Sequence, residues 1–154
     1  MLDIKRVDHI GIRISDRERS VAFYEQLGFH FVAGANYDAG HPIVMRHDSG
    51  LVVNLLGPAN GMPGENILMD RPEKYPGITH FAIKVGSIKA VKEGLARAGI
   101  PISDRRQFMG VSTVFIRDPD RNVIEIVGEG PDVSELIVAF EAKEAEAAAD
   151  DATA

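Results

Sequence analysis

The first pattern in the chain is an alternation of apolar and polar residues over positions 7–15. Successive side chains of a β-strand point to opposite faces, so the three isoleucines of this stretch share one face. His9, Gly11 and Arg13 share the other face. The stretch is therefore predicted to be a strand with one face against the core and a second, polar face that carries a histidine.

This strand belongs to an internal repeat. Shifting the chain by 71 positions aligns residues 7–57 with residues 78–128 without a gap, and six of the 51 pairs are identical. The identical pairs are His9/His80, Ile12/Ile83, Gly28/Gly99, Arg46/Arg117, Val52/Val123 and Gly57/Gly128. The spacing of the apolar residues also matches. Because this period is longer than that of ordinary solenoid repeats, we interpret the chain as two duplicated half-domains.

Both halves predict the order β-α-β-β-β. The predicted elements are strands 7–15 and 78–86, helices 16–27 and 87–98, and extended segments 29–33, 43–46, 51–56, 100–103, 114–117 and 122–127. Each helix is followed by a glycine, a common stop signal. Ser15 or Asp16 is the candidate N-cap of the first helix, and Gly86 or Ser87 that of the second. The predicted fold class is therefore α+β.

The repeat also sets the domain organisation. We expect modules at about 5–57 and 77–129, joined by a linker over 58–76 that is rich in proline and glycine. A helix over 132–148 is predicted to follow, because a capping-box pattern precedes a helical stripe of apolar residues. The pattern and stripe comprise Asp132, Glu135, Val133, Leu136, Ile137 and Phe140. The acidic, alanine-rich tail over 149–154 is expected to be disordered.

Composition narrows the function classes. The 154 residues contain no cysteine, which excludes disulfides, thiolate metal sites and thiol nucleophiles. The net charge is −6, and no basic stripe supports nucleic-acid binding. No apolar run approaches the length of a membrane span, and the first residues lack the apolar region of a signal peptide. We therefore expect a soluble, cytoplasmic protein.

The candidate chemistry lies on the polar faces of the strands. His9 and His80 occupy equivalent positions there, and Glu125 lies on the face opposite Ile124 and Ile126. A single strand histidine often serves only as a hydrogen-bonding residue. A carboxylate within an apolar strand is more unusual, because its burial costs several kcal/mol unless a cation compensates it. Two imidazoles and one carboxylate suit a divalent first-row metal: Fe²⁺, Mn²⁺, Zn²⁺, Ni²⁺ or Co²⁺.

Three segments resemble a known superfamily. They are Val-Asp-His9-Ile-Gly-Ile, Gly-Ile-Thr-His80-Phe-Ala-Ile, and Asp118-Pro-Asp-Arg-Asn122-Val-Ile-Glu125-Ile. Together they resemble the vicinal oxygen chelate superfamily, which contains glyoxalase I, extradiol dioxygenases, fosfomycin-resistance enzymes and bleomycin-binding proteins. The resemblance covers residues 5–129.

The resemblance implies a fold and a metal site. The fold would be a single domain over 1–131, in which the two modules form an open, cup-shaped mixed β-barrel, commonly within a homodimer. His9, His80 and Glu125 match three metal-ligand positions, and Glu125 would also be the catalytic carboxylate. The chain departs from the pattern at Asn54, where glyoxalase I carries glutamate or glutamine, and at Arg121, which replaces the usual turn glycine.

Four residues are candidate substrate contacts. Arg13 and Lys84 share strand faces with the histidines and could attract an anionic group, or they could simply face solvent. Asn54 is the repeat partner of Glu125. Phe115 stands ten residues before Glu125, where extradiol enzymes tend to carry a tyrosine.

Three functions compete at this stage. An extradiol-type dioxygenase is favoured, because a two-histidine, one-carboxylate site leaves positions open for a chelating substrate and O₂. A glyoxalase-like lyase, isomerase or thiol transferase is the alternative, against which Asn54 argues because an amide cannot act as a base. A metal-free binding protein of the bleomycin-resistance type is the third, although it would not need the three ligands.

Overall fold

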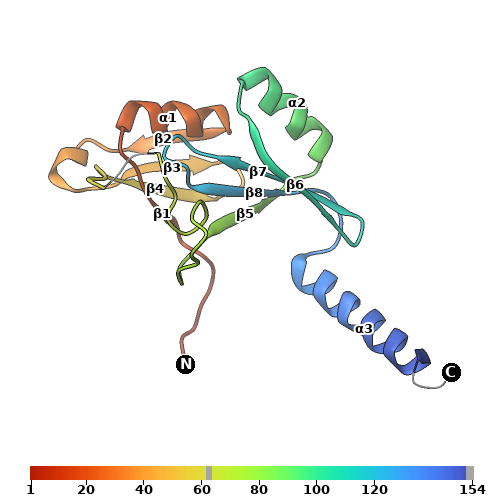
Figure 1. Ribbon diagram of the computed structural model, residues 1–154. Coiled ribbons are helices and arrows are strands. Elements are labelled where there is room, and N and C mark those ends of the chain that lie inside the picture. The colour runs from red at the N-terminus through yellow and green to blue at the C-terminus, as the bar shows by residue number, and fades with distance from the viewer. Residues whose placement is uncertain (62–63, 152–154) are drawn as a thin grey trace. The chain divides into compact units, whose positions relative to one another are not determined.

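The computed structural model describes residues 1–61 and 64–151 (Figure 1). Its elements are β1 (Ile10–Arg13), α1 (Arg17–Gln26), β2 (Phe29–Ala33), the short 3₁₀ helix η1 (Tyr37–Ala39), β3 (Ile43–His47), β4 (Val52–Leu56), β5 (His80–Lys84), α2 (Ile88–Ala98), β6 (Ile102–Phe108), β7 (Val111–Arg117), β8 (Val123–Val127) and α3 (Val133–Asp151). The predicted α+β class is confirmed, as are the tandem βαβββ modules and the C-terminal helix.

The strands form two open four-stranded sheets with the same topology, β1-β4-β3-β2 and β5-β8-β7-β6. In the first sheet β1 runs parallel to β4, and the other neighbours are antiparallel. Backbone hydrogen bonds are also repeated between the two sheets. Ile14 N donates to Leu56 O over 2.8 Å, and Val85 N, 71 positions later, donates to Val127 O over 2.9 Å. The duplication read from the sequence is therefore visible in individual hydrogen bonds.

The edge strands share a further irregularity. The register of β2 against β3 shifts between Phe31 and Ala33, and that of β6 against β7 shifts between Ile102 and Asp104. These positions are related by the same offset of 71 residues. Bulges of this kind twist an edge strand and discourage pairing with other chains.

The described residues gather into two compact units. The first comprises Met1–His80 with Arg117–Val123, and the second comprises Phe81–Ile116 with the residues from Ile124 onward. In the first unit α1 lies across one face of its sheet (Figure 1), where the predicted apolar face of β1 is buried. The main buried side chains of this unit are Ile12, Ile14, Tyr24, Phe29, Ile43, Met45, Val53 and Leu55.

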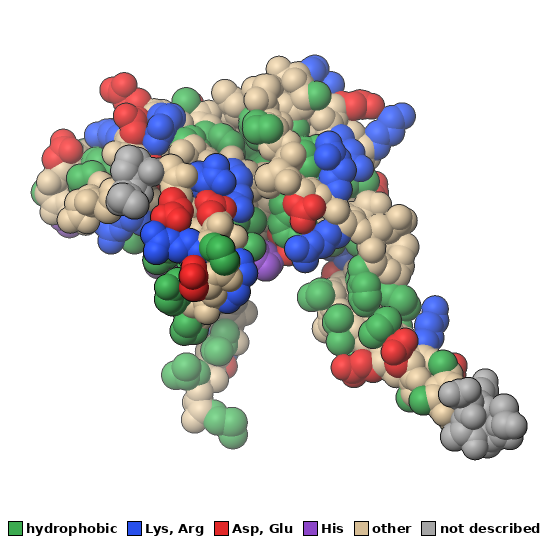
Figure 2. Space-filling view, in the orientation of Figure 1, with side chains coloured by type: hydrophobic (Ala, Val, Ile, Leu, Met, Phe, Trp, Pro, Cys, Tyr) green, Lys and Arg blue, Asp and Glu red, His purple; other side chains and the backbone are tan. Residues whose placement is uncertain are grey.

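The core of the second unit contains apolar residues from both helices and from β7 and β8. They are Leu95, Ile100, Val111, Val114, Ile116, Ile124, Ile126 and Leu136. The apolar residues of β5 are only half-buried. Phe140 of α3 packs against Phe108 at the end of β6, with ring centroids 5.4 Å apart. Leu136 of the same stripe is buried, whereas Val133 and Ile137 are exposed. Green apolar side chains are accordingly visible along α3 in the space-filling view (Figure 2).

The helix boundaries follow the predicted capping signals. Asp16, rather than Ser15, caps α1 by accepting a hydrogen bond from Arg19 N over 2.8 Å. Ser87 caps α2 in the same way through Ala90 N, at 3.2 Å. At the start of α3, Asp132 N donates to Glu135 Oε2 over 2.8 Å, which is one arm of the predicted capping box.

Several predicted boundaries were wrong. The first strands of both modules are shorter than predicted, so His9 immediately precedes β1 and His80 begins β5. β6 and β7 are longer than predicted, because they form a hairpin whose tight turn includes Met109 at φ +49° and Gly110 at φ +85°. The tail was expected to be disordered from residue 149, yet α3 continues to Asp151. Residues 152–154 lie outside the described part of the chain, and so do residues 62–63 of the linker.

None of the helices in the described ranges combines the length and the apolar character needed to cross a membrane.

Candidate functional site

The polar face of the first sheet is centred on Asn54. In the strand register Gly11 of β1 lies beside Asn54 on one side, and Val44 of β3 lies beside it on the other. Gly11 has no side chain, and a Cβ at this position would lie 3.4 Å from Leu56 Cδ1, so the leucine side chain covers the glycine. Asn54 Oδ1 is buried and has no hydrogen-bond partner among the described residues. A buried acceptor without a donor costs about 1–3 kcal/mol, so it marks a position that a ligand could satisfy.

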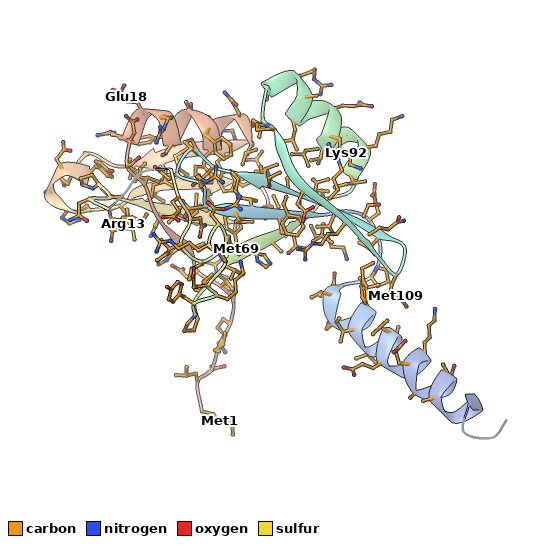
Figure 3. All side chains as sticks on the ribbon, viewed as in Figure 1. Met1, Arg13, Glu18, Met69, Lys92 and Met109 are labelled. Carbon is orange, nitrogen blue, oxygen red and sulfur yellow. The ribbon has the colours of Figure 1, made fainter. Side chains whose placement is uncertain are left out.

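Arg13 lies on the same face. It follows Gly11 by two residues and is paired in register with Leu56 at the end of β4. Its side chain is exposed and points away from α1, on which Glu18 is labelled (Figure 3). The expectation that Arg13 lies on the polar face of the strand is thus met, while its contact with a substrate stays a prediction.

Glu125 occupies the corresponding place in the second unit. It is half-buried in β8, whereas its neighbours Ile124 and Ile126 are buried on the core face. Gly128 N donates to Ser112 O over 2.8 Å. Counting back along the antiparallel strands from this bond places Phe115 beside Glu125 on the same face. The sequence-based assignment of Glu125 to the face opposite the core is correct.

The side chain of Phe115 is not freely accessible to a ligand. Its side chain is only 8% exposed. The guanidinium carbon of Arg106 lies 5.0 Å from the centre of its ring, which is the geometry of a cation–π contact. Arg106 Nε in turn donates to Asp104 Oδ2 over 3.3 Å. Phe115 is therefore a buried neighbour of Glu125 on this strand face, and its ring contacts Arg106.

Lys84 is already paired. Its ammonium lies 2.6 Å from Asp132 Oδ1, directly before α3. Because both groups are substantially exposed, the pair contributes little to stability. It does reduce the positive charge that Lys84 can offer to an anionic substrate, so Arg13 is the more available of the two predicted cations.

Both predicted ligand histidines are held at Nδ1 by the preceding residue. His9 Nδ1 lies 2.8 Å from Asp8 Oδ2, and His80 Nδ1 lies 2.9 Å from Thr79 Oγ1. Hydrogen bonding to His9 lowers the pKa of the Asp8 carboxyl. Asp8 and Thr79 are themselves 71 positions apart. These two residues were not among the predicted site residues, although each directly precedes a predicted ligand histidine at equivalent positions of the repeat.

The Asp118-to-Asn122 segment, which carried part of the resemblance, is a buried polar turn. Asp118 is 3% exposed and accepts hydrogen bonds from Asn122 N, Asn122 Nδ2 and Asp120 N at 2.8, 2.8 and 3.0 Å. Tyr24 Oη of α1 donates to Asp118 Oδ2 over 3.2 Å. Burial raises the pKa of the Asp118 carboxyl, and the bonds from Asn122 oppose that shift. This turn is structural, since its polar groups are used to join α1 to residues 118–122.

Residues at the same turn also hold part of the linker between the modules in place through hydrogen bonds and ion pairs. Asp70 accepts a hydrogen bond from Arg121 Nε over 2.8 Å and lies 3.0 Å from Arg117 Nη2. Asn66 N donates to Asp70 Oδ2 over 2.8 Å, and Asn66 Nδ2 donates to Arg121 O over 3.1 Å. The bond from Arg121 is the main reason that the pKa of Asp70 falls to about 2. Arg121 adopts φ +66°, and its repeat partner Gly50 has φ +89°, so arginine occupies a left-handed position that favours glycine.

The donors predicted for a metal are nitrogen and oxygen atoms of His9, His80 and Glu125, a set that suits a divalent first-row ion. The orphaned oxygen of Asn54 is compatible with such a ligand on the first sheet. Within residues 1–61 and 64–151, however, no group of three or more His, Cys, Asp or Glu side chains is arranged to hold a metal ion. The three-ligand site therefore stays a prediction.

Comparison with solved structures supports the fold. A glyoxalase/dioxygenase from Nostoc punctiforme matches with a TM-score of 0.68 and 18% identity over 84% of this chain and 94% of that one. A glyoxalase family protein from Enterococcus faecalis matches with a TM-score of 0.68 and 23% identity over 82% and 99%. Lactoylglutathione lyase from Agrobacterium tumefaciens matches with a TM-score of 0.61 and 17% identity over 82% and 96%. At these identities the likeness concerns the fold alone.

A comparison with curated proteins gave no significant match. The family model of the Glyoxalase/Bleomycin resistance protein/Dioxygenase superfamily matches residues 6–126, which is most of the chain. This range contains all the predicted site residues and both βαβββ modules except the last residue of β8. The chain belongs to the Glyoxalase/Bleomycin resistance protein/Dioxygenase superfamily.

Proposed function

We propose that this protein is a metal-dependent enzyme of the vicinal oxygen chelate type, and specifically an extradiol-type dioxygenase. Its substrate would be a small molecule with two adjacent oxygen atoms. His9, His80 and Glu125 would hold a divalent ion, with Fe²⁺ or Mn²⁺ favoured. When bound, such an ion lowers the pKa of a coordinated hydroxyl and stabilises the resulting oxyanion.

The observation that carries the proposal is the pair of matched hydrogen bonds at the two histidines. Asp8 and Thr79 each hold the Nδ1 atom of the following histidine, at 2.8 and 2.9 Å. A bond at Nδ1 orients an imidazole so that Nε2 is the nitrogen that would bind a metal. Metal-binding histidines commonly have their second nitrogen held in this way. A histidine that only covered a strand end would not need the same support in both modules.

The difference between Asn54 and Glu125 favours oxygen chemistry over isomerisation. These residues occupy equivalent positions in the two sheets, yet only Glu125 has a carboxylate. A lyase or isomerase that moves a proton between two carboxylates would lack one of them here, since an amide cannot accept that proton. A dioxygenase needs a single carboxylate beside two histidines, which is the set that this chain offers.

The metal content tests the site. We would purify the protein without oxygen or chelators and measure its metals by plasma mass spectrometry. About one equivalent of iron or manganese is expected, and it should be lost in His9→Ala and His80→Ala. Both variants should keep their circular dichroism spectrum, because these exposed side chains add little to the core. His41→Ala is the matched control, since His41 is exposed and is not a predicted ligand.

The reaction is tested separately. O₂ uptake by the Fe²⁺-loaded protein is measured against a panel of catechols, beside turnover of a hemithioacetal. Uptake with a diol supports the dioxygenase. Turnover of the hemithioacetal without any uptake, particularly in a zinc or nickel protein, would instead identify a glyoxalase-like lyase. Absence of metal from both wild type and variants would point to a binding protein that does not use the three ligands.

A further inference from the structure

The segment before β1 leaves apolar side chains exposed. Residues 1–9, the N-terminal arm, precede the first strand and run away from the sheet of the first unit (Figure 1). Leu2 and Ile4 of this arm are 87% and 77% exposed. Side chains two positions apart lie on the same side of an extended chain, so Leu2, Ile4 and Arg6 form one face at intervals of about 6.6 Å. Apolar surface residues that occur together in this way mark an interaction site.

Arg6 is the charged residue of the arm that is left for a partner. Lys5 Nζ lies 2.7 Å from Asp3 Oδ2, and His9 Nδ1 lies 2.8 Å from Asp8 Oδ2. The hydrogen bond to His9 is the main reason for the lowered pKa of the Asp8 carboxyl, to which the charge of Arg6 adds the smallest contribution. The guanidinium of Arg6 has no hydrogen bond or ion pair with any residue that the structure describes.

A matching face lies on α3 of the second unit. Leu136 of this helix is buried and Phe140 makes an aromatic contact, so this side of α3 faces its own unit. Val133 and Ile137 line the adjacent side and are exposed, Val133 to 74%. Glu141 is also exposed and continues the same row, because residues four positions apart lie one above the other on a helix at intervals of about 6 Å.

The two faces are complementary in spacing and in charge. Each presents two apolar side chains followed by one charged side chain, a cation on the arm and an anion on the helix. Intervals of about 6.6 and 6 Å are close enough for the arm to lie along the helix in the same direction. Ile4 then packs against Ile137, with Leu2 one step nearer the start of α3. Arg6 pairs with Glu141 at the other end, and this ion pair fixes the direction of the arm.

A second copy of this chain is the occupant that the two faces favour. Both faces stay exposed in the single chain, although one chain carries each of them. A two-fold dimer would use both faces twice, since each arm would lie on the α3 helix of the other copy. Direct pairing of two α3 helices is disfavoured, because the exposed part of α3 carries Glu141, Glu144 and Glu146 against Lys143 alone, and like charges would meet.

We propose that this protein forms a homodimer by reciprocal exchange of its arms, in which residues 2–6 of each copy dock on Val133, Ile137 and Glu141 of the other. Exchange of identical segments between two copies is a low-cost route to a dimer, because every contact is made twice. The proposal does not rest on the proposed function, since none of these residues is a predicted metal ligand or substrate contact.

Sedimentation velocity of the full chain tests the dimer. Wild type should sediment as a dimer whose population rises with protein concentration. Arg6→Glu and Glu141→Arg should each raise the dissociation constant by about 2- to 30-fold, the effect of losing two exposed ion pairs. The double variant Arg6→Glu/Glu141→Arg should recover the wild-type value, because it reverses both partners. Lys5→Glu and Glu146→Arg make the same charge changes away from the two faces, so these matched controls should leave the dissociation constant unchanged.

Cysteine cross-linking shows on which chain each arm docks. The sequence contains no cysteine, so an introduced thiol is the only one in its chain. Chains with Ile4→Cys mixed with chains with Ile137→Cys should form a disulfide-linked dimer under mild oxidation. Chains with Ile4→Cys mixed with chains with Val138→Cys are the control, because Val138 is exposed on another side of the helix and should cross-link far less.

Four results would overturn the proposal. Wild type could be monomeric at every concentration up to about 1 mM, or its dimer could be unaffected by Arg6→Glu and Glu141→Arg. The double variant could fail to recover the wild-type dissociation constant. A disulfide could form only inside chains that carry both Ile4→Cys and Ile137→Cys, since the arm would then dock on its own helix. The substituted side chains are exposed, so circular dichroism spectra should match wild type throughout.

Discussion

The anchoring of the linker by Asp70 gives a stability prediction that can be worked out in detail. In Asp70→Asn the side chain keeps its size but loses its charge. In the native protein the hydrogen bonds from Arg121 and from Asn66 N, together with the charge of Arg117, lower the pKa of Asp70 from 3.8 to about 2. A difference of nearly two pH units corresponds to about 2 kcal/mol of folding free energy at neutral pH. For a chain of this length that is a fall of about 4–8 °C in Tm.

The pH dependence has a definite sign. Because the pKa of Asp70 is lower in the folded state, its contribution is fully present above pH 4 and is lost as the pH falls toward 2. The difference in stability between wild type and Asp70→Asn should therefore be largest near pH 7. It should shrink to about half by pH 3, where Asp70 is mostly protonated in the unfolded chain and still mostly ionised in the folded chain.

Thermal unfolding followed by circular dichroism at pH 7, 5 and 3 measures this difference. Asp3→Asn is a matched control, because Asp3 pairs with Lys5 at 2.7 Å while its side chain is 83% exposed. An exposed pair of this kind contributes little, so its loss should change Tm only slightly. The reasoning fails if Asp70→Asn melts with wild type at pH 7, or if the two proteins differ by the same amount at every pH.

Two further substitutions test the packing of the first unit. Tyr24→Phe removes the donor to the buried Asp118 carboxyl, 3.2 Å away, and should lower the free energy of unfolding by about 1–3 kcal/mol in urea titrations; an unchanged midpoint would mean that this hydrogen bond adds no net stability. Gly57→Ala would place a methyl group against Tyr37 Oη, so it should cost at least about 1–3 kcal/mol, whereas Gly61→Ala meets no described residue within 4 Å and should be close to neutral. Equal stability of the two alanine variants would contradict the close contact.

Much of the fold could be predicted from the repeat because backbone pattern and apolar spacing are local signals. The faces of β1 and β8 were predicted correctly, since alternation alone decides them. The ends of strands were less predictable. His9 falls outside β1 because strand length depends on pairing with β4, whose ladder with β1 begins at Ile10 and Val53. Sequence pattern contains no information about where a partner strand stops.

The candidate site, too, could be predicted only in part. The equivalence of His9 with His80 was evident from the repeat, and so was the placement of Glu125 on the face opposite the core. The pairing of Lys84 with Asp132, 48 residues later, was not, because contacts distant in sequence leave no periodic trace. Arg121 is a similar case. Its departure from the turn pattern was visible, but its hydrogen bond to Asp70 required the structure.

The shared hydrogen-bond frame of the two sheets has an evolutionary consequence. Equivalent backbone bonds, such as Ile14 N to Leu56 O and Val85 N to Val127 O, are present in both modules. Asn54 and Glu125 show that the outward face of that frame has meanwhile diverged in chemistry. Selection could therefore alter one copy's ligand contacts while the other copy kept its own. Two modules with one backbone frame can thus carry different side-chain chemistry without any change of fold.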